Sequence, residues 1–435
     1  ALYDTDGNLH CDVTSDFINN SSEDYGGAIL NGEGSINDIT GVFINNSSKS
    51  FGGAIYSNSD LVNITADFIS NSVTRIDSYV AEGGAIHTAY QLGAISGNFV
   101  GNYVVASKGA LGGAVYSEST ITNLTGKFIG NYARSTSGTA LGGAIYTTES
   151  LTVSADNGTT LFSENYTQVG DGEKDYNAIY VDSSSATLTL NARNNGIIQF
   201  NDNINGISGY TLSITGDSTS TVNIYNTISN AKLNVSGVGK VDFADGVVRE
   251  FNFSSMTSNK NVKYSIDVDL TNNTSDTFII SGDSTGIITI NNLNVIDGTW
   301  GDFIKSNGVI KVIQASSSGL QLAITDKLKA ELGKYSKTIT KNEKDIVSST
   351  VTSSKNLYDY DNATVKGSIG IGTTTTTNDS LQVFYEFISG TRTQLDTLAE
   401  LLQLETSDER NFNVISDYTA ISDLGTATAG TININ

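Results

Sequence analysis

Hydrophobic and polar positions alternate along most of the chain, which is typical of strands with one buried face. In the first half, an aliphatic residue, a small residue and a phenylalanine occupy alternate positions, as in Ile39, Gly41 and Phe43. This order of large, small and large side chains fills a narrow interior without overpacking it. The same order recurs at Ile64-Ala66-Phe68, Ile95-Gly97-Phe99 and Leu124-Gly126-Phe128.

Two short motifs repeat in step with this alternation. An asparagine follows each phenylalanine by three positions, and Gly-Gly-Ala with a branched residue follows at a variable distance. Asparagine tolerates left-handed backbone, and Gly-Gly allows a tight corner. Each repeat unit is therefore expected to form one coil of the chain, with one corner at the asparagine and a second at Gly-Gly. Stacked coils would align each motif into a column. The repeat-defining residues are Phe17, Asn20, Gly26, Gly27, Phe43, Asn46, Gly52, Gly53, Phe68, Asn71, Gly83, Gly84, Phe99, Asn102, Gly112, Gly113, Phe128, Asn131, Gly142 and Gly143, with a further pair at Phe162 and Asn165.

The pattern predicts an all-β fold, a right-handed parallel β-helix (β-solenoid) with short helical segments near the C-terminal end. We expect the regular β-helix over residues 1–181 and a less regular continuation over 182–325. Residues 326–412 are predicted to form a partly helical cap or linker, because leucines recur at helical spacing in 326–345 and 393–404. Residues 413–435 alternate again and are expected to resume strand structure, as the start of a further domain.

The amino-acid composition excludes some classes of binding partner. The net charge is −22, from 24 Lys and Arg against 46 Asp and Glu, whereas nucleic acid and anionic lipid need a basic face. Nucleic acid is therefore not expected as a partner. Proline is absent where average usage predicts about 20, which suits an uninterrupted hydrogen-bonded ladder. No apolar run is long enough to span a membrane as a helix, so membrane attachment is expected only through a part outside this chain.

Candidate chemistry is sparse. Asp267 and Asp269 share a predicted strand face about 7 Å apart, within the range of inverting glycosidase carboxylates. Neither has an Arg or His neighbour in sequence, and a solvated strand face is the preferred interpretation. Neither a metal site nor a nucleophilic triad can be built from His10, Cys11 and His87, because the ligands are too few. No catalytic residue and no cofactor is expected.

The N-terminal segment offers a weak calcium candidate. Asp4, Asp6 and Asn8 have the spacing that opens an EF-hand-type loop. Leu9 replaces the expected turn glycine, and Ser15 stands where the closing glutamate belongs. A polar turn is therefore preferred to a calcium site.

An aromatic column follows the Gly-Gly-Ala motif. If Ile29 and its equivalents face the interior, this column points outward and could stack on sugars or on a neighbouring rod. If the alanines face inward instead, the column belongs to the core, and the sequence leaves both orientations open. The candidate binding stripe, which begins at Leu30, contains Tyr56, His87, Tyr116, Tyr146 and Tyr180.

The paired Phe-x-x-Asn and Gly-Gly-Ala-Ile motifs over residues 13–181 resemble the repeat of the chlamydial polymorphic outer-membrane protein family. That family is similar to type V autotransporters, in which a β-helical passenger is carried out by a C-terminal membrane barrel. Archaeal adhesin-like surface proteins have a similar repeat. The resemblance implies an extracellular or cell-surface location, with an outer-membrane association.

The expected function is that of a non-enzymatic, adhesin-like passenger that presents a long rod for attachment or display. Its partner would be a surface protein or glycan of a host or neighbouring cell. One alternative is a structural subunit that self-associates rod to rod into a surface filament or layer. Another is a polysaccharide-degrading β-helix enzyme.

Overall fold

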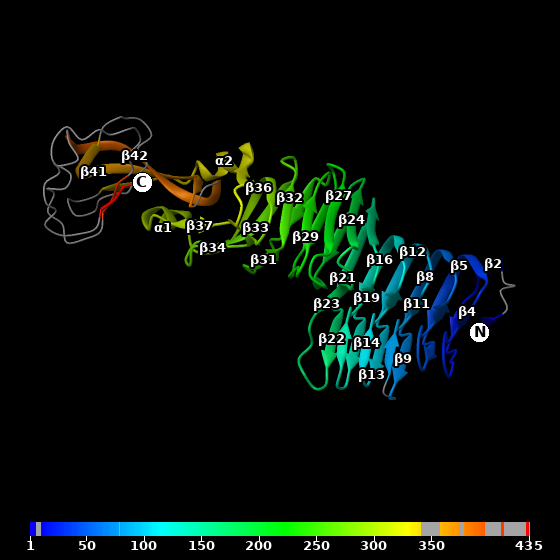
Figure 1. The fold of residues 1–435 in the computed structure, drawn as a ribbon. Helices are drawn as coiled ribbons and strands as arrows, with labels where there is room; N and C mark the ends of the chain where they lie inside the picture. Colours follow the sequence, from blue (N-terminus) through cyan, green and yellow to red (C-terminus); the bar gives the residue numbers. More distant parts are fainter. Residues whose placement is uncertain are drawn as a thin grey trace.

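The chain forms a stack of β-coils in the computed structural model (Figure 1). The structure describes residues 1–5, 10–77, 79–340, 357–374, 378–395, 410–412 and 432–434. Nearly all regular structure in these residues is β, and consecutive coils pair in parallel over the body of the stack. The predicted all-β solenoid, with short helices towards its C-terminal end, is confirmed.

The longest sheet carries the phenylalanine column. Phe43, Phe68, Phe99 and Phe128 pair in register from coil to coil, and their side chains are fully buried. Their rings stack with centroids 4.6 to 4.8 Å apart, close to the spacing of adjacent strands. The strands are β5 (Ser35–Ile44), β8 (Leu61–Ile69), β12 (Leu92–Val100) and β16 (Ile121–Ile129), preceded by β2 (His10–Thr14) and β3 (Phe17–Ile18).

From residue 151 onward, two shorter strands replace each long strand, and the column continues through Phe162 and Phe200, whose centroids are 4.5 Å apart. The first halves are β20 (Leu151–Asp156), β24 (Thr187–Arg193), β27 (Thr211–Gly216), β29 (Lys232–Val235) and β32 (Ser255–Ser258). The second halves are β21 (Thr159–Ser163), β25 (Ile197–Phe200), β28 (Thr221–Ile224), β30 (Lys240–Asp242) and β33 (Lys263–Asp269). The stack closes with β36 (Ser284–Asp297) and β39 (Leu320–Ile324).

A second sheet holds the branched residues that follow Gly-Gly-Ala. Ile29, Ile55, Ile86 and their equivalents are fully buried in the same core as the phenylalanines. The interior is therefore lined from two sides by columns of nearly identical side chains. The strands are β1 (Leu2–Asp4), β4 (Ile29–Asn31), β7 (Ile55–Ser57), β11 (Ile86–Thr88), β15 (Val115–Ser117), β19 (Ile145–Thr147), β23 (Asn177–Val181) and β26 (Asn203–Gly206).

The Gly-Gly corner has two distinct requirements. Gly112 has a φ of 64°, in the left-handed region that glycine enters without steric penalty. Gly113 instead lies against the next coil, where an added Cβ would be 2.0 Å from the carbonyl oxygen of Gly143. One glycine therefore sets the turn, and the other permits the coils to approach.

The segments between each Asn and the next Gly-Gly form a lateral arm, which the sequence pattern did not predict. In Figure 1 this arm is the part that carries β9, β13, β14 and β22, beside the main stack. One of its sheets contains β6 (Ser47–Ser48), β9 (Ser72–Arg75), β13 (Tyr103–Ala106), β17 (Tyr132–Ser135) and β22 (Tyr166–Val169). The other contains β10 (Val80–Glu82), β14 (Gly109–Leu111) and β18 (Thr139–Leu141). Its separate small core is made of Val73, Ala81, Val104, Ala106, Ala110 and Ala133.

The C-terminal end combines two short helices with a long hairpin. Helix α1 (Trp300–Lys305) was not predicted, whereas α2 (Asp326–Leu332) lies at the start of the expected helical segment. The hairpin of β41 (Leu357–Thr373) and β42 (Asn378–Leu395) makes the described part of 326–412 more strand than helix. Its β42 pairs with β37 (Val309–Lys311) and β41 pairs with β40 (Lys337–Thr340).

Two sequence predictions fall largely outside the described residues. The expected helix at 393–404 starts on the last residues of β42, and residues 396–409 are not described. Of the segment 413–435, the structure describes only β44 (Ile432–Ile434), which pairs in parallel with β43 (Arg410–Phe412). Within the described residues, no helix has the length and apolarity needed to cross a membrane.

Candidate functional site

A continuous asparagine ladder leads to the candidate site. Asn131 Oδ1 accepts the backbone N–H and the side-chain NH2 of Asn102, both at 3.0 Å. Its own NH2 group donates to Asn165 Oδ1 at 2.9 Å and to the carbonyl oxygen of Phe99 at 2.8 Å. The same pattern links Asn46, Asn71 and Asn102, so each buried amide is satisfied by its neighbours in the stack.

The ladder ends on a carboxylate. Asp202 Oδ2 accepts the backbone N–H of Asn165 at 3.0 Å and its side-chain NH2 at 2.7 Å, in place of the amide oxygen of a further asparagine. Asp202 is only 2% exposed. Burial raises the pKa of its carboxyl to about 6, although the bonds from Asn165 act in the opposite direction.

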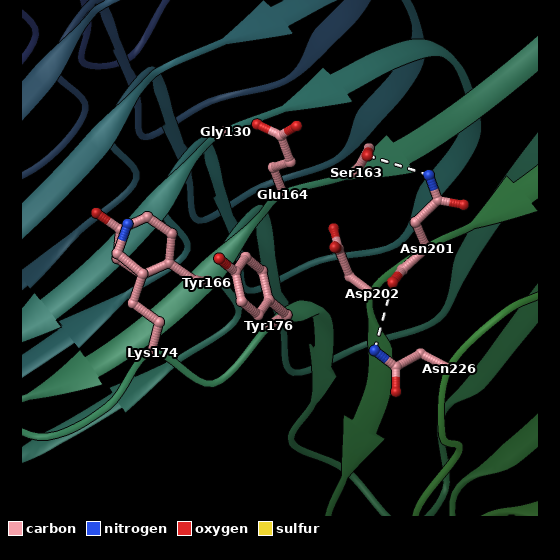
Figure 2. A pocket seen from close by; sticks show the side chains of 9 residues that line it. All are labelled: Gly130, Ser163, Glu164, Tyr166, Lys174, Tyr176, Asn201, Asp202 and Asn226. Atoms are coloured by element: carbon pink, nitrogen blue, oxygen red, sulfur yellow. Dashed lines mark hydrogen bonds between the residues drawn. The ribbon is translucent and has the colours of Figure 1, made fainter. Parts of the chain in front are cut away.

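A polar hollow of about 440 Å³ opens over this carboxylate, where the arm ends against the coils of the main stack. Figure 2 shows the side chain of Asp202 between those of Glu164, Asn201 and Tyr176. The hollow is lined by Gly130, Ser163, Glu164, Tyr166, Lys174, Tyr176, Asn201, Asp202 and Asn226.

Tyrosines from the arm form one wall of the hollow. Tyr103, Tyr132 and Tyr166 stack along the arm with centroids 5.0 Å apart, and Tyr166 is the last ring of this series. Lys174 Nζ lies 4.0 Å from the centroid of the Tyr166 ring, within the range of a cation–π contact. Tyr176 meets Tyr166 edge to face at 6.4 Å and is 45% exposed.

The floor of the hollow is fixed by amide and hydroxyl contacts. Asn201 donates its side-chain NH2 to Ser163 Oγ at 3.1 Å (Figure 2). The backbone carbonyl oxygen of Asn201 accepts from the side-chain NH2 of Asn226 at 3.3 Å. Glu164 is exposed at the rim and has a φ of 61°, in the left-handed region. The site therefore combines an open aromatic ring with convergent carboxylates and amides, a combination common in ligand pockets.

The predicted aromatic stripe lies elsewhere and is largely covered. Tyr56, His87, Tyr116, Tyr146 and Tyr180 stack in register with centroids 4.7 to 5.9 Å apart, on the side of their strands that faces away from the central core. The column thus takes the outward one of the two orientations that the sequence left open. His87, Tyr116 and Tyr146 are nevertheless at most 6% exposed, so these three rings are covered.

The arm explains this difference. Glu82 on β10 contacts His87, with Oε2 2.9 Å from Nε2, which places the arm against the column. Tyr116 donates to Glu118 at 3.1 Å and Tyr146 donates to Asp182, and burial is the main cause that raises the pKa of both tyrosines. A sequence pattern read coil by coil does not reveal that an inserted segment folds back over the column.

Asp267 and Asp269 do not share a solvated face. Asp267 is fully buried, and its Oδ2 accepts the backbone N–H groups of residues 245, 246 and 247 at 2.9, 2.8 and 3.1 Å. Asp269 instead caps the turn at 271–272, and hydrogen bonds, first that from the Asn272 side chain, lower its pKa. The two carboxylates serve separate structural roles.

A second buried carboxylate accompanies Asp267. Asp276 accepts the backbone N–H of Asp267 and of Arg249, both at 2.8 Å. Burial raises the pKa of Asp276 to about 7, and the nearby charge of Asp267 acts in the same direction. Both groups anchor the loop between β30 and β31 (Glu250–Phe253).

Of the calcium candidate, the structure describes one residue. Asp4 is buried on β1, beside Asn31 on the next coil, whereas Asp6 and Asn8 lie outside the described residues. Cys11 is half-buried and its thiol is free. Among the residues that the structure describes, no group of three or more His, Cys, Asp or Glu side chains could hold a metal ion.

A family model matches part of the chain. Residues 40–58 match the Chlamydia polymorphic membrane protein repeat. This segment contains Phe43, Asn46, Gly52 and Gly53, one copy of each motif. No curated protein matches the chain. At a coarse level the matched repeat supports a cell-surface location, and its residues lie within the stacked coils of the solenoid.

Sequence reasoning missed Asp202 because the spacing changes at the last rung. Phe162 and Asn165 are three positions apart, whereas Phe200 and Asp202 are two positions apart and the amide has become a carboxylate. The alternation of Ile198 and Phe200 just before a turn was the sequence signal that could have indicated a further rung of the ladder. Tyr166, Lys174 and Tyr176 belong to the arm, whose folding no repeat predicted.

Proposed function

We propose that this chain is the rod of a non-enzymatic cell-surface protein of adhesin type, in which a β-solenoid carries a lateral arm towards a partner on another cell. The observation that carries the proposal is the unbroken register of the Phe and Asn columns from coil to coil. A ladder in which every buried amide is paired resists bending and local opening of the coils. A spacer that presents a binding surface needs this stiffness. The matched repeat supports display at a surface.

The chemistry of the candidate acids supports a non-enzymatic role. An inverting glycosidase needs one protonated carboxyl and one carboxylate that both reach the substrate. Asp267 is occupied by three backbone N–H groups beneath the surface, and Asp269 by the turn that follows it. Neither is placed to meet a glycosidic bond.

The charge of the chain favours recognition by shape and hydrogen bonding. With a net charge of −22, the rod repels anionic surfaces at long range. A partner is therefore expected to bind through aromatic and polar contacts. A surface protein or a glycan that lacks strong negative charge meets that requirement, and export or anchoring by an autotransporter route belongs to the same proposal.

Attachment is the direct test. Beads coated with the folded chain are incubated with cultured epithelial cells and with bacterial cells, and retained beads are counted after washing in flow. We expect retention well above that of beads coated with an unrelated protein of similar acidity. Equal retention of both bead types would overturn the adhesin proposal, and detectable release of reducing sugar from a polysaccharide would overturn its non-enzymatic part.

A further inference from the structure

We propose that the hollow above Asp202 is a binding site for a neutral sugar ring. This inference rests on the proposed adhesive function and assigns to it a ligand class and a location. The site lies where the asparagine ladder, the tyrosine stack of the arm and the inserted segment 170–176 meet. The reasons are the open aromatic ring, the arrangement of its polar groups and its charge.

The aromatic surface offers one free face. The side chain of Lys174 lies against the Tyr166 ring, with Nζ 4.0 Å from the ring centroid. Tyr176 is held by an edge contact with Tyr166 and is 45% exposed, so its ring remains open to a ligand. Sugar rings present an apolar face of C–H groups, which packs on such a ring, while their hydroxyls need polar partners at the edge.

The polar partners converge from different segments. Glu164 stands at the rim, the Asp202 carboxyl and the Asn201 amide lie beside Tyr176, and Asn226 reaches in from the next coil (Figure 2). Carboxylates accept two hydroxyl bonds each, and amides both donate and accept. Asp202, Asn201 and Asn226 already form hydrogen bonds within the protein, and their oxygen atoms can each accept a further bond. The hydroxyl groups of a sugar supply such bonds, whereas an apolar ligand does not.

Charge excludes the acidic sugars. Glu164 and Asp202 place two carboxyl groups at the site against the single ammonium group of Lys174, which already lies on an aromatic ring. A carboxylate or sulfate on the sugar would meet a like charge at short range. A neutral pyranose or its N-acetyl derivative avoids this repulsion.

The chain offers a matched pair of variants that test the site without disturbing the fold. Gly130 lines the hollow with a φ of 64°, and an added Cβ there would meet nothing within 4 Å. Asparagine occupies the equivalent left-handed position at Asn45, so Gly130→Asn should fill the hollow and keep the backbone. Gly101→Asn makes the same change one coil earlier, where an added Cβ would meet only the Ser70 hydroxyl at 3.8 Å.

Saturation-transfer NMR on the full chain gives the readout. The probes are the methyl glycosides of glucose, galactose, mannose and N-acetylglucosamine, with N-acetylneuraminic acid as the acidic comparison. We expect saturation of at least one neutral glycoside, at least tenfold weaker binding in Gly130→Asn and Tyr176→Ala, and no change in Gly101→Asn or in Tyr90→Ala, which alters an exposed tyrosine elsewhere. Circular dichroism confirms that each variant is folded.

Three results would overturn the inference: no transfer to any neutral glycoside, binding that survives both pocket variants, or preferential binding of the acidic sugar. The bead assay separates this failure from failure of the proposed function. If beads coated with the wild-type chain attach but no neutral glycoside binds, adhesion stands and the sugar site is wrong. If glycosides bind but no bead attaches, the site stands and the adhesive role fails.

Discussion

Asn165 donates both its backbone N–H and its side-chain NH2 to the same oxygen of Asp202, at 3.0 and 2.7 Å. At every earlier rung described, the acceptor of this pair of bonds is the amide oxygen of an asparagine. The end of the ladder is therefore the one rung of this series whose acceptor can change its charge.

The first prediction concerns that charge. Burial raises the pKa of Asp202 to about 6 in the folded chain, so this carboxyl ionises at a lower pH in the unfolded chain than in the folded chain. The folded state thus loses stability as pH rises from about 4 to about 6, by on the order of 2–3 kcal/mol, and regains it on acidification. Asp202→Asn keeps the acceptor oxygen and removes the charge. We expect it to be more stable than wild type at pH 7.5 and similar at pH 4.

Urea unfolding at both pH values, followed by circular dichroism, measures this difference. A variant that is less stable than wild type at pH 7.5 would show that the carboxylate is better accommodated than burial implies. The remaining pH dependence in Asp202→Asn should include Asp276, whose pKa is raised to about 7 and whose contribution has the same sign.

The second prediction concerns the interior of the ladder. Asn131→Ala removes the acceptor of the Asn102 N–H and NH2 groups and the donor to the Phe99 carbonyl, and all of these are buried. Unpaired buried groups cost about 1–3 kcal/mol each, reduced where water can enter. We expect a loss of about 3–5 kcal/mol in unfolding free energy. Asn20→Ala, at a half-exposed rung whose Oδ1 accepts only from the exposed N-terminal ammonium group, should lose under about 1 kcal/mol.

Hydrogen exchange should locate the effect. In Asn131→Ala, the amides of residues 102 and 131 and their neighbours on adjacent coils are expected to exchange faster, because a solenoid opens locally between its repeats. Uniform acceleration over all coils would instead indicate a single cooperative unit.

The third prediction concerns the approach of the coils at the Gly-Gly corner. Gly113→Ala would place a Cβ 2.0 Å from the Gly143 carbonyl oxygen and 2.6 Å from the backbone of Tyr132. No side-chain movement can relieve contacts with backbone, so we expect a large loss of thermal stability or failure to fold. Gly158→Ala is the control, since its Cβ would meet only the Asp156 carbonyl oxygen at 3.7 Å. Thermal melts of the two variants should differ by many degrees.

The fourth prediction separates structural from catalytic roles of the buried acids. Asp267→Ala leaves the N–H groups of residues 245, 246 and 247 without their acceptor, and we expect a loss of about 3–5 kcal/mol and faster exchange of these amides. Asp269→Ala affects a solvent-accessible turn and should lose much less. If either variant altered an activity of the folded chain on polysaccharide, the structural interpretation would be wrong.

The columns of the solenoid could be predicted from sequence because each coil contacts mainly its two neighbours. Phe43, Phe68 and Phe99 are far apart in sequence, yet a repeated motif at each coil forces them into one column. The Asn ladder follows for the same reason, since one unit with a left-handed turn specifies every other unit. Local pattern and global packing coincide in these residues.

The candidate site could not be predicted, because it depends on segments that do not repeat. The residues between Asn131 and Gly142 and their equivalents vary in length, and nothing in their pattern indicates that they pair into an arm. That arm decides whether Tyr116 faces solvent or protein, and where Tyr166 and Tyr176 stand. Asp267 was misjudged similarly, since the loop that covers it comes from a different coil.

The amino-acid pattern alone therefore dictates the class of fold, the identity of the core columns and the residues that turn the chain, because these depend on interactions repeated at every coil. The covering of the tyrosine column, the carboxylate at the end of the ladder and the hollow beside it arise only once the arm and the coils are packed together. They depend on single contacts between distant segments, such as that of Asn165 with Asp202, which no periodicity encodes.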